Sequence, residues 1–307
     1  MLSAKEVTDF RQKILTWYTE NKRILPWRAL PFDEGLQLRD PYKILISEVM
    51  SQQTQIDRVI PKYEAWIKKF PTVSHVAEAS VADVLTYWSG LGYNRRVLNL
   101  KKTAEVIVKK YQGKFPQEET ELLLLPGIGS YTARAMLCFA FNQQVVVVDT
   151  NVRKVILTQI AMKRHSGEDE GRLQNPDSGH LPAMQSNALQ AGARMTDKEI
   201  EEIAIQLLPA GQAYEWNQAL MDYAGSVLKK EKIAVPKQSK FVGSHRYYRG
   251  QILKLLLQKK QLKINEVGPL IKQDYAVDEE AWLQNLVAEL VREGFIAKED
   301  GSIKLVS

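Results

Sequence analysis

The sequence of 307 residues is 45% hydrophobic and carries a formal net charge of +6 at pH 7. Its length allows two or three domains with a sizeable core, and the moderate positive charge suits a polyanionic partner without requiring one. The single cysteine, Cys138, excludes an internal disulfide and a metal cluster built from cysteines.

Hydrophobic periodicity predicts a succession of helices over the first 160 residues, joined by short connections. The expected helices lie near residues 5–20, 41–53, 55–69, 80–88, 95–111, 117–124, 130–141 and 150–161. Pro26, Pro31, Pro41, Pro71 and Pro116 fall at the boundaries of these segments, where helix breakers belong. No alternating pattern typical of strands competes with the helical one. This part of the chain is therefore expected to be mainly α.

The composition changes over residues 164–195, where Ser, Gly, Asn, Gln and Asp predominate and the periodicity is lost. We expect a long mobile insertion there, because such a segment cannot bury enough apolar surface to fold. Helices are expected again near 197–208 and 214–229. The insertion therefore interrupts a helical domain of residues 1–230 and does not end it.

The C-terminal part has a different design. Residues 231–243 are basic and polar and are expected to form a linker, and residues 244–307 a winged-helix-like module. The expected elements of this module are helices near 247–259, 265–273 and 278–293 and strands at 295–298 and 303–306. Its lysines could face phosphates, or they could be the solvated face of a helical cap.

An acidic residue stands inside an otherwise apolar predicted helix, because Glu48 lies within the sequence ILISEVM of residues 44–50. Burial raises the pKa of a carboxyl group, which suits a general acid; a capped or salt-bridged helix acid is the alternative. Gln52, Gln53 and Thr54 follow. Their donors and acceptors suit the probing of bases or the filling of the gap left by an extruded base, or equally a polar helix end.

Two glycine-containing turns each open a predicted helix. The first, residues 89–96, combines Gly92 and Tyr93 with two arginines. The second consists of Pro126, Gly127, Ile128, Gly129 and Ser130. Such a turn lets backbone N–H groups point outward at a helix N-terminus, where the dipole favours an anion such as a DNA phosphate. We expect replacement of either glycine of the second turn to weaken phosphate binding.

A carboxylate ends the apolar run that follows the second turn. Four valines, at 145–148, lead directly to Asp149, and Asn151 follows. A carboxylate at the edge of an apolar run, close to a phosphate-binding turn, indicates chemistry on nucleic acid. A loop nearer the N-terminus joins Arg23, Trp27 and Arg28, whose side chains suit stacking on bases and pairing with phosphates; Trp27 alone would also suit a core position.

Together these segments resemble the adenine DNA glycosylases (MutY-like) of the helix-hairpin-helix, endonuclease III superfamily. The resemblance covers roughly residues 8–160 and 197–230. It rests on the motifs LPWR at 25–28, SEVM at 47–50 with QQT at 52–54, GLGY at 90–93, LPGIG at 125–129, Asp149 with Asn151, and NQALMD at 217–222. It implies a mainly α, two-lobed helix-hairpin-helix glycosylase fold, here with a small winged-helix-like module at the C-terminus.

The resemblance also implies roles for individual residues. Enzymes of this family extrude a base from the duplex to reach its glycosidic bond. Glu48 would protonate the adenine leaving group and help to activate water, and Asp149, with Asn151 nearby, would stabilise the oxocarbenium ion at the sugar. Tyr131 stands where relatives with strand-cleaving activity carry a Schiff-base lysine, so a monofunctional enzyme that leaves an abasic site is expected.

The remaining residues implied by the resemblance divide into two groups. The base pocket would be lined by Arg23, Trp27, Arg28 and Gln218. The DNA contacts would come from Gln52, Gln53, Thr54, Gly92, Tyr93, Pro126, Gly127, Ile128, Gly129 and Ser130.

Three departures from the family pattern limit what the resemblance implies. Residues 228–240 contain no cysteine, so the family's iron–sulfur cluster is expected to be absent, with no metal site and at most a monovalent cation at the hairpin. The C-terminal module is too short for the Nudix-like domain that recognises 8-oxoguanine. Ser51 and Asn94 replace common residues of the family. Adenine chemistry is therefore better supported than 8-oxoguanine selectivity.

The expected function is base excision repair by removal of adenine mispaired with 8-oxoguanine or guanine in double-stranded DNA. A glycosylase for thymine or uracil opposite guanine is the first alternative, although Glu48 favours adenine because a departing purine benefits from ring protonation. The second alternative is a DNA-binding protein without catalytic activity. No membrane-spanning run or signal-peptide pattern is found, so a cytoplasmic, nucleoid-associated protein is expected. A monomer is expected because one active site suffices and no coiled-coil pattern appears.

Overall fold

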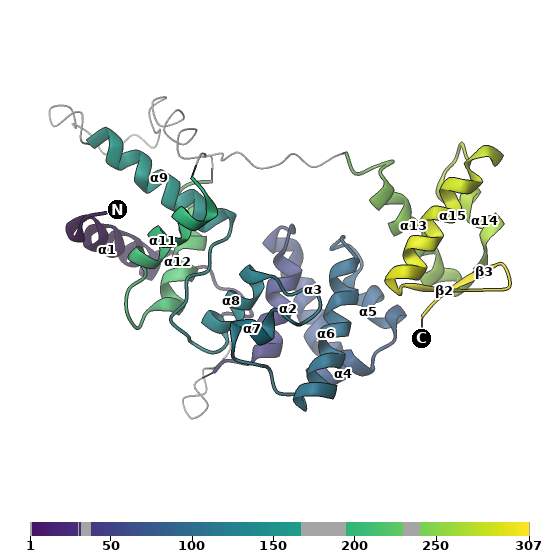
Figure 1. Cartoon of the computed structure of the whole chain (residues 1–307), viewed down its shortest axis with the longest axis horizontal. Helices are drawn as coiled ribbons and strands as arrows, with labels where there is room; N and C mark the ends of the chain where they lie inside the picture. Colours follow the sequence, from purple (N-terminus) through teal and green to yellow (C-terminus); the bar gives the residue numbers. More distant parts are fainter. Residues whose placement is uncertain (1, 30, 32–37, 167–194, 230–239, 307) are drawn as a thin grey trace. The chain divides into compact units, whose positions relative to one another are not determined.

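The computed structural model describes residues 2–29, 31, 38–166, 195–229 and 240–306 (Figure 1). Over these residues the chain is mostly helical, with one small sheet near the C-terminus. It divides into two compact units, and each unit is assembled from two separate stretches of chain. The first unit consists of Met1–Pro41 and Ser130–Pro236, and the second of Tyr42–Gly129 and Lys237–Ser307.

The first unit is built around one helix that is buried on most of its surface. It contains helices α1 (Ala4–Asn21), α8 (Ser130–Phe139), α9 (Thr150–Ser166), α11 (Asp197–Leu207) and α12 (Ala213–Ser226). Ten of the 14 residues of α12 are buried, because α1, α8 and α9 all pack against it. Phe10 of α1 meets Trp216 of α12 edge to face, with ring centroids 6.0 Å apart.

The first stretch of the second unit is also helical. Its helices are α2 (Pro41–Ser51), α3 (Ile56–Lys69), α4 (Val73–Glu78), α5 (Val81–Trp88), α6 (Arg95–Tyr111) and α7 (Glu119–Leu122). Helix α6 packs against α4 and α5, and α3 against α5. Trp66 and Trp88 are fully buried and meet edge to face at 5.9 Å.

The second stretch of this unit contains the sheet. Its elements are α13 (His245–Lys259), β1 (Gln261–Lys263), α14 (Ile264–Ile271), the 3-10 helix η1 (Val277–Glu279), α15 (Glu280–Glu293), β2 (Ile296–Glu299) and β3 (Ser302–Leu305). The strands are antiparallel in the order β1-β3-β2. The register pairs Leu262 with Ile303; both are buried, and the three helices of this stretch pack against the sheet.

Most of the helices expected from the sequence are confirmed within a few residues. Two elements were missed, α4 and β1, and the expected domain boundaries remain predictions. Residues 167–194 of the expected insertion and 231–239 of the expected linker lie outside the described residues. In the described part of the chain, no helix combines the length and the apolar character that crossing a membrane requires.

Candidate functional site

Glu48 lies on α2, in the second unit, between residues that are withdrawn from solvent. Ser47, Val49 and Met50 beside it are at most 5% exposed, whereas Glu48 itself is half-buried. Glu48 therefore belongs to a buried stretch of helix without being fully withdrawn from solvent. This placement is compatible with a group that exchanges protons with a substrate, and the catalytic role of Glu48 stays a prediction.

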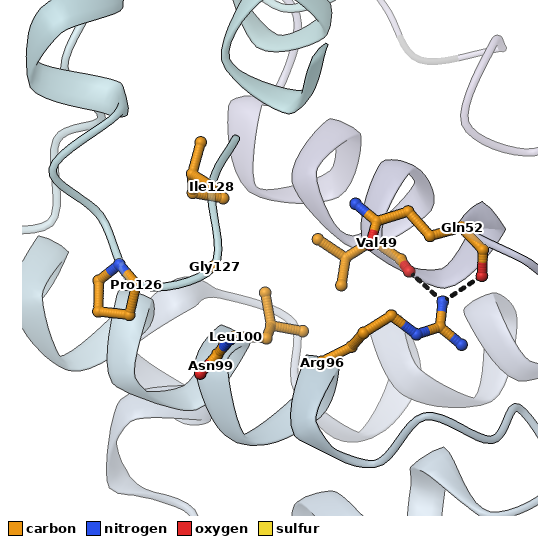
Figure 2. A pocket seen from close by; sticks show the side chains of 8 residues that line it. All are labelled: Val49, Gln52, Arg96, Asn99, Leu100, Pro126, Gly127 and Ile128. Atoms are coloured by element: carbon orange, nitrogen blue, oxygen red, sulfur yellow. Dashed lines mark hydrogen bonds between the residues drawn. The ribbon is translucent and has the colours of Figure 1, made fainter. Parts of the chain in front are cut away.

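Arg96 joins the end of α2 to the first glycine turn. Its Nη1 donates to the carbonyl oxygens of Val49 at 2.6 Å and Gln52 at 2.6 Å (Figure 2). Its Nη2 donates to those of Leu91 and Gly92, both at 3.2 Å. The carbonyl groups at the C-terminus of a helix lack partners within the helix and carry its negative dipole end, so a cation is stabilising there. Burial lowers the pKa of Arg96 to about 10, and it remains charged at neutral pH.

Two residues in the segments that Arg96 bridges have left-handed backbone conformations without being glycine. Gln53 has a φ of 55° and Tyr93 a φ of 48°. This conformation is uncommon for residues with a side chain and is found more often at functional sites than elsewhere. Both side chains are exposed. The structure thus presents Gln53 and Tyr93 outward, on segments that Arg96 holds together.

The second turn, between α7 and α8, is seated on α6. The Oγ1 of Thr103 donates to the carbonyl oxygen of Pro126 at 2.7 Å. Gly127 has a φ of +77°, and a Cβ placed on it would lie 2.7 Å from the Cβ of Asn99. Gly129 has neither restriction. The backbone therefore requires glycine at 127 but not at 129. The sequence alone predicts the same effect for both glycines.

A cavity of about 40 Å³ lies between the end of α2, α6 and this turn (Figure 2). It is lined by Val49, Gln52, Arg96, Asn99, Leu100, Pro126, Gly127 and Ile128. Its size suits one or a few water molecules and not a nucleobase. The cavity thus lies where α6 meets two segments predicted to contact DNA, and it is not a base pocket.

Asp149 lies in the first unit, immediately before α9, in the position of a helix N-cap. Its Oδ1 accepts from the backbone N–H of Val152 at 2.7 Å, and its Oδ2 from Nδ2 of Asn151 at 2.8 Å. Burial raises the pKa of Asp149 above its usual value, although both hydrogen bonds act in the opposite direction. The carboxylate is thus held in a fixed orientation and is easier to protonate than a solvated aspartate.

Asn217 on α12 fixes the valine run that leads to Asp149. It is 1% exposed; its Oδ1 accepts from the N–H of Val147 at 2.9 Å, and its Nδ2 donates to the carbonyl oxygen of Val145 at 3.1 Å. These bonds satisfy buried backbone groups of a segment that is neither helix nor strand. Asn217 stands in the motif NQALMD of residues 217–222, but the sequence alone assigned it no role.

Asp222, on the same helix, is fully buried and forms ion pairs with both arginines of the N-terminal loop. Its Oδ1 lies 2.5 Å from Nη2 of Arg23, and its Oδ2 2.6 Å from Nη1 of Arg28. Burial alone would raise the pKa of Asp222, but the hydrogen bonds and charges of Arg28 and Arg23 outweigh it, so the pKa lies below its usual value. These arginines therefore anchor their loop to α12.

The other predicted site residues have the following places. Trp27, which precedes Arg28 in the sequence, is buried, and Gln218 is buried one helical turn before Asp222. Tyr131 is half-buried near the start of α8, and Ser130 is exposed at its first position. Thr54 is half-buried, and its Oγ1 accepts from Nη2 of Arg96 at 3.3 Å. The base-pocket and DNA-contact roles of these residues stay predictions.

Comparison with known proteins identifies the family. Residues 46–173 match the family model described as HhH-GPD superfamily base excision DNA repair protein. These residues belong to the HhH-GPD superfamily. The chain is 46% identical over 144 residues to an adenine DNA glycosylase of Mycolicibacterium smegmatis, covering 47% of each protein. It is 35% identical over 251 residues to the adenine DNA glycosylase of Mus musculus, covering 80% of this chain and 44% of the relative.

The chain thus spans about half the length of the curated relatives that it matches. Among solved structures, a thermostable thymine-DNA glycosylase superposes with a TM-score of 0.56 at 24% identity, covering 79% of this chain and 94% of the other. A trapped endonuclease III–DNA covalent intermediate superposes with a TM-score of 0.52 at 17% identity, covering 73% and 86%. At these identities the superpositions show a shared fold.

A four-cysteine iron–sulfur cluster does not fit this chain. Its one cysteine, Cys138, is buried on α8 and accepts from Nδ2 of Asn217 at 3.4 Å. Within the described residues, no group of three or more His, Cys, Asp and Glu side chains could hold a metal ion.

Proposed function

We propose that this chain is a monofunctional adenine DNA glycosylase of base excision repair, acting on adenine mispaired with 8-oxoguanine or guanine in double-stranded DNA. The observation that carries the proposal is the match to the family over residues 46–173, which include Glu48, Tyr131 and Asp149. The names of the relatives support adenine as the base removed. The mispairing partner rests on the sequence resemblance alone.

In the proposed reaction, Glu48 donates a proton to a ring nitrogen of adenine as the bond between the base and C1′ of the sugar breaks. The bonding electrons leave with the base. The carboxylate of Asp149 stabilises the positive charge that develops on the sugar ring. Water then adds to C1′ and gives its proton to the carboxylate of Glu48, which restores the acid for the next cycle. The products are free adenine and an abasic site.

The described contacts support different tasks for the two carboxyl groups. Asp149 is held by Val152 and Asn151, so its oxygens are preorganised as a charge stabiliser. Glu48 is half-buried in a helix whose end is fixed by Arg96. The contacts therefore distinguish a carboxylate that is held by fixed donors from one that lies half-buried on a helix.

DNA binding is proposed to use the turn at residues 126–130 for a phosphate and Gln52, Gln53 and Tyr93 for the duplex at the extruded base. Support comes from the left-handed, exposed placement of Gln53 and Tyr93 and from the seating of the turn on α6. The chemistry is proposed to proceed without an iron–sulfur cluster, with at most a monovalent cation at the turn. The protein is proposed to act as a monomer at the nucleoid.

One assay tests the proposal. Labelled duplexes carrying A opposite 8-oxoguanine, A opposite G, T opposite G and U opposite G are incubated with the protein, and half of each sample is treated with alkali. Cleavage that occurs at adenine and depends on alkali is the expected result. Cleavage at thymine or uracil would contradict the choice of base, and cleavage without alkali would contradict the assignment of Tyr131 as a residue that forms no Schiff base.

A further inference from the structure

The second unit contains a large groove whose lining includes Gln52, Gln53 and Tyr93, which are proposed to contact DNA, and extends beyond them to α13. It has a volume of about 1030 Å³ and lies between α13 and the turn at residues 89–94. Arg246 connects its two sides: Nη1 donates to the hydroxyl oxygen of Tyr93 at 2.8 Å, and the guanidinium carbon lies 5.2 Å from the centroid of the same ring. The groove is therefore formed by two stretches of chain that are about 150 residues apart.

The lining of this groove is strongly basic. Six of its residues are arginine or lysine, namely Arg58, Arg95, Arg96, Arg246, Arg249 and Lys254, and Glu293 is the one acidic residue of the lining. Arg249 is neutralised by Glu289 and Glu293, at 2.8 and 2.6 Å. Arg58, Arg95 and Lys254 have exposed side chains. The charge of the groove is thus complementary to a polyanion.

The charges of the C-terminal helices indicate which surface of this stretch faces that polyanion. Helix α13 contains two arginines and two lysines and no acidic residue, whereas α15 contains three glutamates and one arginine. In helix-turn-helix proteins the second helix of the motif enters the major groove. If α15, which precedes the β2–β3 hairpin, entered the major groove in this way, its three glutamates would approach the DNA phosphates and be repelled by them. The distribution therefore favours contact through α13, which lines the groove.

We propose that this groove extends the DNA-contact surface of Gln52, Gln53 and Tyr93 onto α13, and that it takes the phosphodiester backbone of duplex DNA through Arg95 of α6 and Lys254 of α13. The proposal rests on the proposed function for its ligand, duplex DNA, and adds a binding surface beyond the helix-hairpin-helix turn. Contacts of cations with phosphates release counterions, so each one adds to the salt dependence of binding and none reads the base sequence.

The test compares duplex binding by two double variants. Arg95→Ala combined with Lys254→Ala removes two exposed cations from the groove. Lys259→Ala combined with Lys298→Ala removes two exposed lysines that do not line it and is the matched control. The dissociation constant of a duplex without any mispair is measured by fluorescence anisotropy over a range of salt concentrations, and the thermal unfolding of each variant is followed to establish that it is folded.

The groove variant is expected to bind about tenfold more weakly at low salt, and its slope of log K against log salt is expected to be smaller by about 2. The control is expected to retain both values. An unchanged slope in the groove variant, or an equal loss in the control, would overturn the proposal. A wild-type protein that excises no adenine would contradict the proposed function, but a reduced slope in the groove variant would still support this site.

Discussion

At the scale of the residue, the environment of Asp149 links its protonation to both stability and activity. Because burial raises its pKa in the folded state, this group contributes stability below its unfolded pKa, and that contribution is lost as the pH rises through the higher folded value. Charge stabilisation at the sugar requires the ionised form. Excision is therefore expected to decline as the pH falls through the raised pKa, at a higher pH than an ordinary aspartate would give.

Replacing Asn151 tests this dependence. In Asn151→Ala the hydrogen bond from Nδ2 to Oδ2 of Asp149 is lost, and with it one of the contacts that lower the pKa of Asp149. The acidic limb of the single-turnover rate of adenine release is expected to move to higher pH. Thr150→Ala, at the exposed neighbouring position, is expected to leave the limb in place. A limb that moves to lower pH in Asn151→Ala would contradict the assignment.

The buried ion pairs of Asp222 give a prediction for stability. Asp222→Asn leaves Arg28, whose side chain is 10% exposed, without its counter-ion, and the loss of one partner of a buried pair costs about 3 kcal/mol. Asp197→Asn, at a carboxylate that is 96% exposed in its pair with Arg153, is expected to cost less than about 1 kcal/mol. Urea unfolding at neutral pH measures both. Equal losses would show that burial does not decide the effect.

The sign of the pH dependence follows from the direction of the shift. The pKa of Asp222 is lowered in the folded protein, so its contribution to stability is present above the unfolded pKa and is lost as the pH falls through the folded one. The stability difference between the wild type and Asp222→Asn should therefore narrow in acid.

At the scale of the element, the two glycines of the turn before α8 are expected to behave differently. Gly127→Ala introduces a side chain at a φ of +77° and 2.7 Å from Asn99, so the turn must shift on α6, with a loss of stability of about 1 kcal/mol or more. Gly129→Ala meets no atom within 4 Å and is expected to retain the wild-type unfolding temperature. A comparable destabilisation of both variants would contradict the described turn.

Arg96 gives a second prediction at this scale, because one side chain holds the end of α2 and the glycine turn together. Arg96→Met keeps a side chain of similar length but removes the donors to four carbonyl groups, and we expect a loss of about 2–3 kcal/mol. Arg95→Met, at the exposed neighbour, is expected to change stability by less than about 0.5 kcal/mol. Thermal unfolding compares the two variants. Similar unfolding temperatures would show that Arg96 does not organise these segments.

The sequence predicted the longer elements and missed the shortest. Helices α1 and α6 have 18 and 17 residues, enough for a hydrophobic period to be recognised. Helix α4 has six residues, of which Val73 and Val76 are buried, which is too few to define a period. Strand β1 has three residues and depends on pairing with β3, about 40 residues later, so no local sequence pattern predicts it.

The same distinction between local and distant information applies to the candidate site. Glu48 and the turn at residues 126–130 stand in short motifs, so the sequence alone could single them out. The partners of Asp222 and Asn217 lie 199 and 70 residues away along the chain. The sequence shows that Arg96 stands beside a glycine turn, but its carbonyl partners at the end of α2 could not be predicted. Every residue has a backbone carbonyl group, so the identity of the accepting residue does not indicate such a hydrogen bond.

At the scale of the whole molecule, the division into two units predicts which helices a destabilising substitution in one core affects. Phe10 of α1 is 5% exposed against Trp216, and Phe10→Ala is expected to cost about 3–4 kcal/mol. Hydrogen exchange is then expected to accelerate in α9, α11 and α12, which share this core, and much less in α3, α5 and α6. Uniform acceleration over both units would show that they unfold together.

The composition of the first unit also has a consequence for the order in which the protein folds during its synthesis. Helix α1 packs against α12, which follows about 200 residues later. At typical translation rates of 5–20 residues per second, α1 waits roughly 10–40 s on the ribosome before its partner emerges. The helices of residues 42–129 pack against near neighbours in sequence and can form within that time. The apolar face of the nascent N-terminal helix is thus a natural substrate for a chaperone.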